Sequence, residues 1–200
     1  MIKRKISNIK KRKNPLDNIL FLETNFPDIE FTMFGNGKDS EVYKFSIKKS
    51  IVVGNILLKP GKYVIKLPHE YIEFYDVKYL NKVNLFSKYG LIPKIYVYNK
   101  NFVIMKFIEG DNLYDVFKTF TRQEKIDIVN DIEKIIKIYH KLKFVHGDLT
   151  IANVLITPSR KLYIIDPDPL IIDGFEEYVD PDSDYDALDY IRKKYGLLSK

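Results

Sequence analysis

The stretch that decides the fold is FVHGDLTIANVLI, residues 144–156, which places His146, Asp148 and Asn153 in a short polar island between apolar residues. An Asp can accept a proton from an attacking hydroxyl, and the carbonyl oxygen of an Asn can ligate a hard cation such as Mg²⁺. The island has the spacing H-x-D-x-x-x-x-N and is predicted to leave a long helix and enter a strand. This pattern indicates a catalytic loop that handles phosphate and metal.

The N-terminal half of the chain is strand-rich. β-Branched and aromatic residues between Gly-bearing turns predict antiparallel strands from Phe31 to Leu67, and a helical period follows from His69 to about Tyr89. Thr121 and Glu124 fit a capping box that opens a long helix. The other expected elements are strands at 92–99 and 101–108, helices at 111–120, 122–142 and 182–196, and a hairpin at 154–166.

This order of elements predicts an α+β fold with two lobes: an antiparallel-sheet N-lobe followed by a reduced helical C-lobe. Residues 1–30 are expected to form a basic arm and lead-in, residues 31–109 the N-lobe and residues 110–200 the C-lobe. The boundary should fall near Glu109–Asp111. With 46% hydrophobic residues in 200, the chain can bury a core of this size.

Composition excludes several classes of protein. The chain has no Cys, so disulfides and thiolate chemistry are ruled out, and no apolar run is long enough to span a bilayer. The basic N-terminus lacks the apolar region of a secretory signal, so we expect a soluble cytoplasmic protein. Basic residues crowd this end, which indicates either a solvated arm or a contact with RNA, another polyanion or an acidic partner. They are Lys3, Arg4, Lys5, Lys10, Lys11, Arg12 and Lys13.

Three further features need explanation together with the polar island. Gly35 and Gly37 are expected in a turn between two strands, where a missing Cβ lets backbone N–H groups approach a polyphosphate. Lys66 ends an apolar strand and needs a phosphate or a carboxylate, unless it is an edge-strand Lys facing water. Asp166 ends the last hairpin strand, where a carboxylate either ligates magnesium or forms a turn. An ordinary hairpin turn would equally explain the two glycines alone.

The conjunction of these features favours one chemistry. A Gly-rich hairpin, a strand Lys, a helix, the H-x-D-x-x-x-x-N loop and a hairpin ending in Asp follow the order of parts in protein kinases. Phosphoryl transfer requires aligned reactants and neutralised charge, and therefore backbone donors, a Lys, metal ligands and a base.

With these motifs, the chain resembles the protein-kinase-like superfamily, in its H-G-D branch. GNGKDSEVYKF resembles the phosphate loop of RIO kinases, and HGDLTIANVLI resembles the loops of RIO kinases and of the small kinase of the KEOPS (tRNA threonylcarbamoylation) complex. FVIMKFIEGDNL is similar to a fifth strand and hinge. The resemblance covers roughly residues 31–195 and implies a minimal, bilobal protein-kinase-like fold that uses ATP and Mg²⁺.

The resemblance also implies a role for each matching residue. Lys66 would pair with the α- and β-phosphates, Asp148 would be the catalytic base, and Asn153 and Asp166 would hold magnesium. Gly35, Gly37 and Ser40 would cover the phosphates. Met105 would be the gatekeeper, with the backbone of Lys106 to Ile108 facing the adenine. The carboxylate that orients Lys66 is expected to be Glu73, with Glu70 and Asp76 as the alternatives.

The departures from the pattern concern regulation and substrate. Pro167 and Asp168 follow Asp166, which predicts a stiff metal loop, and Gly147 replaces the Arg that would bind a phosphorylated activation loop. The short segment between Asp166 and the last helix leaves no room for the peptide platform of ordinary kinases. The chain also lacks the helical substrate subdomain that small-molecule phosphotransferases usually add. We therefore expect an atypical Ser/Thr-type protein kinase or autokinase, with a protein substrate or partner complex. The alternatives are a small-molecule phosphotransferase of the aminoglycoside or choline kinase type, and an ATPase that acts as an assembly factor.

Overall fold

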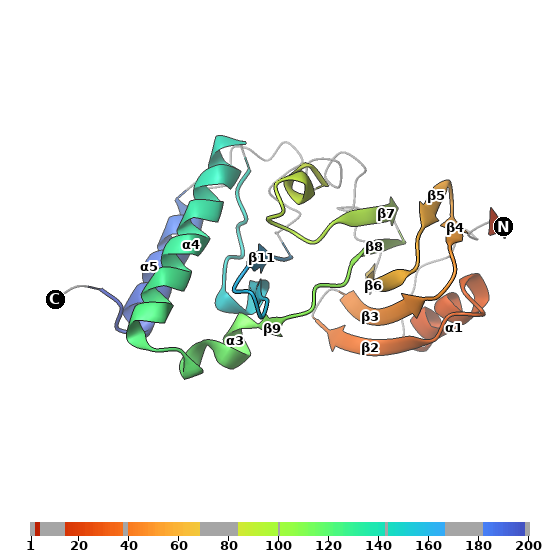
Figure 1. The fold of residues 1–200 in the computed structure, drawn as a ribbon, viewed down its shortest axis with the longest axis horizontal. Helices are drawn as coiled ribbons and strands as arrows, with labels where there is room; N and C mark the ends of the chain where they lie inside the picture. Colours follow the sequence, from red (N-terminus) through yellow and green to blue (C-terminus); the bar gives the residue numbers. More distant parts are fainter. Residues whose placement is uncertain are drawn as a thin grey trace. The chain divides into compact units, whose positions relative to one another are not determined.

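The structure is a computed structural model that describes residues 3–4, 15–37, 40–68, 84–99, 101–142, 144–166 and 182–198. The chain divides into two compact units. Unit 1 comprises Met1–Asn84 and Lys94–Phe107, and unit 2 comprises Leu85–Pro93 and Ile108–Lys200. Most strands belong to unit 1 and the longest helices to unit 2 (Figure 1). The expected α+β class, with an antiparallel sheet in the first part and helices in the second, is confirmed.

Unit 1 is built on a five-stranded antiparallel sheet in the order β2-β3-β6-β8-β7. The strands are β2 (Phe31–Asn36), β3 (Ser40–Ile47), β6 (Gly61–Pro68), β8 (Phe102–Lys106) and β7 (Ile95–Asn99). Side chains alternate between the two faces, so residues two apart share a face. Tyr43, Phe45, Ile65 and Ile104 all lie on one face and are buried in the core.

A helix that the sequence analysis did not anticipate covers this core. Helix α1 (Pro15–Asn25) begins at a Pro, which is well tolerated at a first helical position. Its Phe21 packs against Phe102 of β8 at 5.8 Å between ring centroids, and Phe26 packs against the same ring at 6.2 Å. Phe21, Leu22 and Phe26 therefore belong to the hydrophobic core of unit 1.

A second, smaller sheet of unit 1 has the order β1-β4-β5. The stretch 50–58, expected as one strand-like run, folds into β4 (Ile51–Val53) and β5 (Ile56–Leu58), with a turn at Gly54. Gly54 has a φ of 60°, a conformation that costs a Gly little. From the basic arm, Lys3 and Arg4 form β1, which pairs in parallel with Val52 and Val53. The remaining basic residues of the arm lie outside the described residues.

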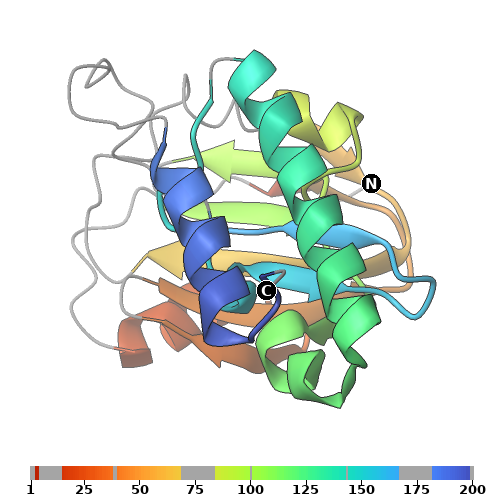
Figure 2. The ribbon, with the colours of Figure 1, turned by 90° about the vertical axis from the view of Figure 1, so that its left-hand side faces the viewer.

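Unit 2 contains two long helices that run side by side, α4 (Arg122–Lys141) and α5 (Ser183–Lys194) (Figures 1 and 2). The predicted capping box is confirmed, because the Thr121 side chain accepts from the Glu124 N–H while Glu124 accepts from the Thr121 N–H. The second bond and the Arg160 guanidinium lower the pKa of Glu124 to about 2. On α4, Val129, Ile132, Ile136 and Tyr139 are buried as predicted, Ile126 is half-buried, and Ile128 and Ile135 are also buried.

The predicted helix at 111–120 is wrong in detail. The chain forms a short strand β9 (Asp111–Asn112), one helical turn α3 (Leu113–Val116) and a 3₁₀ turn η1 (Phe117–Thr119). Strand β9 pairs with β10 (Val154–Ile156), which also pairs with β11 (Leu162–Ile164). The pairing of β9 with β10 explains the difference. A Cβ on Gly110 would lie 2.5 Å from the Ile156 carbonyl oxygen, so only a Gly fits at position 110, where the chain enters β9.

Of the predicted helix from His69 to Tyr89, residues 84–88 are helical and residues 69–83 lie outside the described residues. None of the described helices has both the length and the apolar character that crossing a membrane requires.

Candidate active site

The polar island of unit 2 folds as a tight loop that brings Asp148 and Asn153 into direct contact. The Asn153 side-chain amide donates to the Asp148 backbone carbonyl at 2.8 Å and to Asp148 Oδ2 at 3.0 Å. The 3₁₀ turn η2 (Ile151–Asn153) closes the loop, since Asn153 N–H donates to the Thr150 carbonyl at 3.0 Å. Ile151 is buried and Asp148 is exposed, so an apolar side chain anchors the loop while the carboxylate stays accessible.

These bonds fix the orientation of the Asn153 amide. A carboxylate and a carbonyl can only accept, so the NH₂ group of Asn153 must face Asp148 and its Oδ1 must point elsewhere. Oδ1 is the atom that could ligate a hard cation. The described residues include no cluster of three His, Asp or Glu side chains able to hold a metal ion by themselves. A bound Mg²⁺ would therefore complete its shell with phosphate oxygens and water, as this ion commonly does.

Asp166 lies two residues beyond β11 and not at its end. Its φ is 52°, an unusual left-handed conformation for a residue with a side chain. The preceding Ile165 N–H donates to the Asn153 carbonyl at 2.8 Å, which ties the backbone beside Asp166 to the polar loop. Non-Gly residues in this region cluster at functional sites, where the surroundings maintain the strain. The Asp166 carboxylate is exposed, so its geometry fits a metal ligand.

His146 connects the loop to the segment before Asp166. Its Nδ1 accepts from the Asp148 N–H at 3.3 Å, and its Nε2 lies 2.9 Å from the Ile165 carbonyl oxygen. These partners require a proton on Nε2 and a lone pair on Nδ1, which is the neutral imidazole. The side chain is fully buried, and burial lowers the pKa of His146 although the Ile165 carbonyl acts in the opposite direction. His146 therefore braces the polar loop through hydrogen bonds at both ring nitrogens.

A buried carboxylate that the sequence analysis missed, that of Asp184, holds the backbone of the polar loop. Asp184, in the first turn of α5, is fully buried and accepts from the N–H groups of His146 at 2.8 Å and Gly147 at 3.0 Å. The same carboxylate lies 3.0 Å from His140 Nε2, so His140 has a polar partner in addition to the helix packing expected of it. Gly147 has a φ of 76°, which explains why a Gly stands between His146 and Asp148.

In unit 1, Lys66 lies on β6, the central strand of the sheet. The alternative of an edge-strand Lys facing water is therefore wrong. Lys66 is directly opposite Val42 on β3 and Val103 on β8, and Val42 is in turn opposite Gly35 on β2. Directly paired residues of antiparallel strands point to the same face. Gly35 and Lys66 thus share one row, on the face away from the aromatic core.

The two predicted glycines differ in position. Gly35 lies within β2, next to a register irregularity between Met33 and Gly35, whereas Gly37 follows the strand and donates to the Ser40 carbonyl at 2.9 Å. A Cβ on Gly35 or Gly37 would meet protein atoms no closer than 3.9 and 3.6 Å. Packing with the described protein atoms thus leaves room for a side chain at both. Ser40 is buried at the start of β3.

Met105 lies on the same face as Lys66, in the next row of paired residues, opposite Val64 on β6 and Ile95 on β7. The expected use of the backbone from Lys106 to Ile108 stays a prediction. The Lys106 N–H donates to the Lys94 carbonyl at 2.8 Å and the Phe107 N–H to the Lys62 carbonyl at 3.2 Å. Both donors are therefore engaged in unit 1, and Ile108 N–H is the remaining donor of the stretch.

Several predicted residues cannot be placed. Glu73, its alternatives Glu70 and Asp76, and the two residues after Asp166 lie outside the described residues. The structure thus gives two separate groups: Gly35, Lys66 and Met105 on one face of the unit 1 sheet, and Asp148, Asn153 and Asp166 around one loop of unit 2.

The family model of the RIO domain matches residues 73–169, a range that includes the whole polar loop and Asp166. Over this range, which is just under half of the chain, the chain is similar to RIO-like atypical protein kinases. Within this RIO-like chain, the match begins after Lys66 and ends three residues past Asp166. The resemblance inferred from the sequence motifs is therefore confirmed at the level of the family.

Curated relatives agree with this assignment. The RIO-like chain is 27% identical over 164 residues to the dual specificity protein kinase zakA of Dictyostelium discoideum, a match that covers 75% of this chain and 20% of the relative. It is 31% identical over 77 residues to the KEOPS complex subunit Bud32 of Pyrococcus abyssi, covering 38% of this chain and 34% of the relative. It is 32% identical over 102 residues to the EKC/KEOPS complex subunit bud32 of Dictyostelium discoideum, covering 46% of this chain and 38% of the relative. Each match spans less than two fifths of the relative's length.

Proposed function

We propose that this RIO-like chain transfers the γ-phosphate of ATP, in the presence of Mg²⁺, to a Ser or Thr hydroxyl of a protein. The observation that carries the proposal is the pair of hydrogen bonds from the Asn153 amide to Asp148. One side chain thereby holds the proposed base in place and leaves its own carbonyl oxygen available to a cation. A mere turn-forming loop would not need both.

The roles of the unit 2 residues follow from their chemistry. Asp148 is exposed and accepts one hydrogen bond from Asn153 on Oδ2, so its other oxygen is the one to orient an acceptor hydroxyl and receive its proton. Asn153 Oδ1 and the Asp166 carboxylate would hold Mg²⁺, which neutralises charge on the phosphate oxygens when bound. The backbone bond between Ile165 and Asn153 keeps these two ligands in register.

In unit 1, Lys66 would pair with the α- and β-phosphates. The neighbouring apolar side chains on its face, Val42, Val64 and Met105, offer a surface for a purine. Gly35 and Gly37 would let the backbone approach the phosphates. Their lack of close protein neighbours supports this use, because internal packing does not require a Gly at either position. The orienting carboxylate of Glu73, or of Glu70 or Asp76, stays a prediction.

A second candidate function is an ATPase that controls a partner complex. Two relatives are named as subunits of the KEOPS complex, which favours a partner for this chain as well. Incubation with ATP labelled in the γ-phosphate, alone and with a cell lysate, separates the two functions. Label on a protein, abolished by Asp148→Asn, supports the kinase. Label released only as free phosphate favours the ATPase, and label retained in ATP by the wild type would contradict both.

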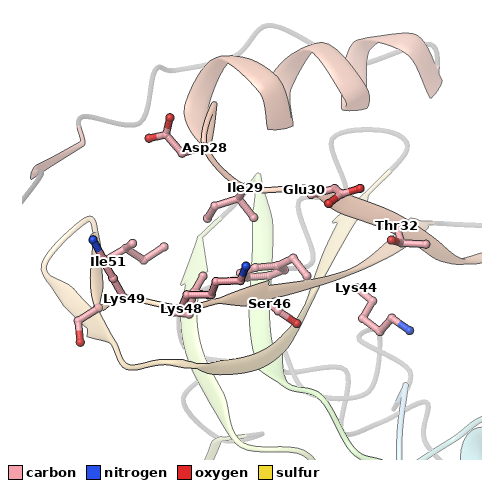
Figure 3. A pocket seen from close by; sticks show the side chains of 12 residues that line it. Asp28, Ile29, Glu30, Thr32, Lys44, Ser46, Lys48, Lys49 and Ile51 are labelled. Carbon is pink, nitrogen blue, oxygen red and sulfur yellow. The ribbon is translucent and has the colours of Figure 1, made fainter.

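The basic residues of the chain are concentrated in unit 1. Unit 1 carries 19 Lys and Arg against 9 Asp and Glu, whereas unit 2 carries 14 against 18. Beyond the basic arm, Lys44, Lys48 and Lys49 line an open groove together with Thr32 and Ser46 (Figure 3). Asp28 and Glu30 lie on its other wall (Figure 3). We therefore propose RNA or another polyanion as a ligand of the arm, with the Lys wall of the groove as its extension.

A further inference from the structure

Lys44 of β3 lies against two aromatic rings that come from distant parts of unit 1. Its Nζ is 5.8 Å from the ring centroid of Phe34 and 5.5 Å from that of Phe107. The two rings also contact each other edge to face, with centroids 5.6 Å apart and an interplanar angle of 80°. The three side chains are called the aromatic bracket below. Both cation–ring distances fall within the range of a cation–π attraction.

The positions of the two rings give the bracket its significance. Phe34 immediately precedes Gly35 on β2, an edge strand that is bonded to β3 alone among the described strands. Phe107 immediately precedes Ile108, the residue with the remaining backbone donor. Lys44 is opposite Thr32 on β2 and Val64 on β6, and therefore on the same face as Lys66. The bracket thus connects the end of β2, which leads into Gly35 and Gly37, to Phe107, which follows β8.

Little else in the described structure holds Phe34. Its side chain is 56% exposed, whereas Phe45 and Tyr63 on the opposite face of the sheet are fully packed. The register irregularity between Met33 and Gly35 interrupts the ladder at this point. A cation shared by two rings is therefore a substantial part of what fixes the end of β2.

We propose that Lys44 is a positioning residue for nucleotide binding. Through Phe34 and Phe107 it sets the position of the Gly35–Gly37 backbone relative to the end of β8 in unit 1, so that one nucleotide can reach both. Lys44 acts through the rings and not by contact with the phosphates. This inference rests on the proposed function, since it concerns the same nucleotide site.

The test compares three variants of the full chain. Lys44→Met keeps the aliphatic stem and removes the charge, and Lys44→Arg keeps a cation able to stack on both rings. Lys59→Met is the matched control, at an exposed residue between β5 and β6 of the same unit. Affinity is measured for Mg²⁺-ATP and for adenosine by calorimetry. Amide hydrogen exchange of residues 33–37 is measured without nucleotide.

Lys44→Met should weaken ATP and adenosine by the same factor, about two- to fivefold, and speed exchange at residues 33–37. Lys44→Arg should restore both properties, and Lys59→Met should change neither. A loss confined to ATP would overturn the proposal, because it would mean that Lys44 contacts the phosphates. Unchanged affinities and exchange in Lys44→Met would overturn it as well. If the wild type binds neither ligand, the proposed function fails, and exchange alone decides whether the bracket holds β2.

Discussion

Asp184 provides the sharpest test of how the polar loop is held. The substitution Asp184→Asn keeps the shape of the side chain and removes its charge. Asp184 accepts two backbone N–H bonds, from His146 and Gly147, and contacts His140, all in a fully buried position. An Asn has one accepting oxygen, so its NH₂ group would face one of the donors.

The cost follows from these contacts. Hydrogen bonds to a charged group contribute about 1.5–3 kcal/mol each, and a buried donor without a partner costs about 1–3 kcal/mol. Allowing for relaxation of the loop, we expect Asp184→Asn to lower the free energy of unfolding by about 2–4 kcal/mol. Asp186→Asn, on an exposed residue of the same helical turn, should cost no more than about 0.5 kcal/mol.

Urea unfolding followed by circular dichroism at pH 7.5 measures both variants against the wild type. The slope of free energy against urea should be unchanged, so that the difference appears in the midpoint. If Asp184→Asn and Asp186→Asn lie within about 0.5 kcal/mol of each other, the buried carboxylate does not hold the loop and the reasoning fails.

The remaining predictions concern the same two groups of residues. Burial lowers the pKa of His146, so near pH 6 the unfolded chain binds a proton at this residue that the folded chain does not bind. The free energy of unfolding should therefore fall as the pH drops below about 6.5. Thermal melts at pH 7.5 and 5.5 check this, and an equal fall in His146→Gln would contradict it. Gly147→Ala should cost about 1–2 kcal/mol of unfolding free energy because of its positive φ, and an unchanged urea midpoint would refute that cost. Lys66→Met should weaken Mg²⁺-ATP binding about 10- to 100-fold by calorimetry, whereas an unchanged affinity would remove Lys66 from the site. Deletion of residues 1–13 should weaken RNA binding and flatten its salt dependence while sparing ATP affinity, and a loss of ATP affinity would show that the arm is not peripheral.

The sequence predicts the parts of this fold whose signals are local. The capping box at Thr121 and Glu124 needs only two residues at the right spacing, and the buried stripe of α4 follows from a period of 3.6 residues. The position of Asp148 and Asn153 in one loop was likewise predicted, because only four residues separate them.

The sequence does not predict features that depend on distant partners. Helix α1 forms because Phe102, more than 70 residues away, supplies a ring for Phe21 and Phe26. The segment 111–120 leaves the helical path because β10 pairs with Asp111 and Asn112.

The role of Asp184 was hidden for a related reason. Its only local signal is an acidic residue in the first turn of a helix, which also describes the exposed Asp186. Three-dimensional proximity to His146 and Gly147, 38 and 37 residues earlier, distinguishes the two. Lys44 is similar, since Phe34 lies on β2 whereas Phe107 follows the end of β8.

A crystal structure with Mg²⁺ and a non-hydrolysable ATP analogue tests the central claim most directly. The account predicts a magnesium ion ligated by Asn153 Oδ1 and the Asp166 carboxylate at about 2.0–2.1 Å. It also predicts that Lys66 Nζ lies within hydrogen-bonding distance of the α- or β-phosphate of the same nucleotide. A nucleotide bound away from Lys66, or a metal held by neither Asn153 nor Asp166, would contradict the account.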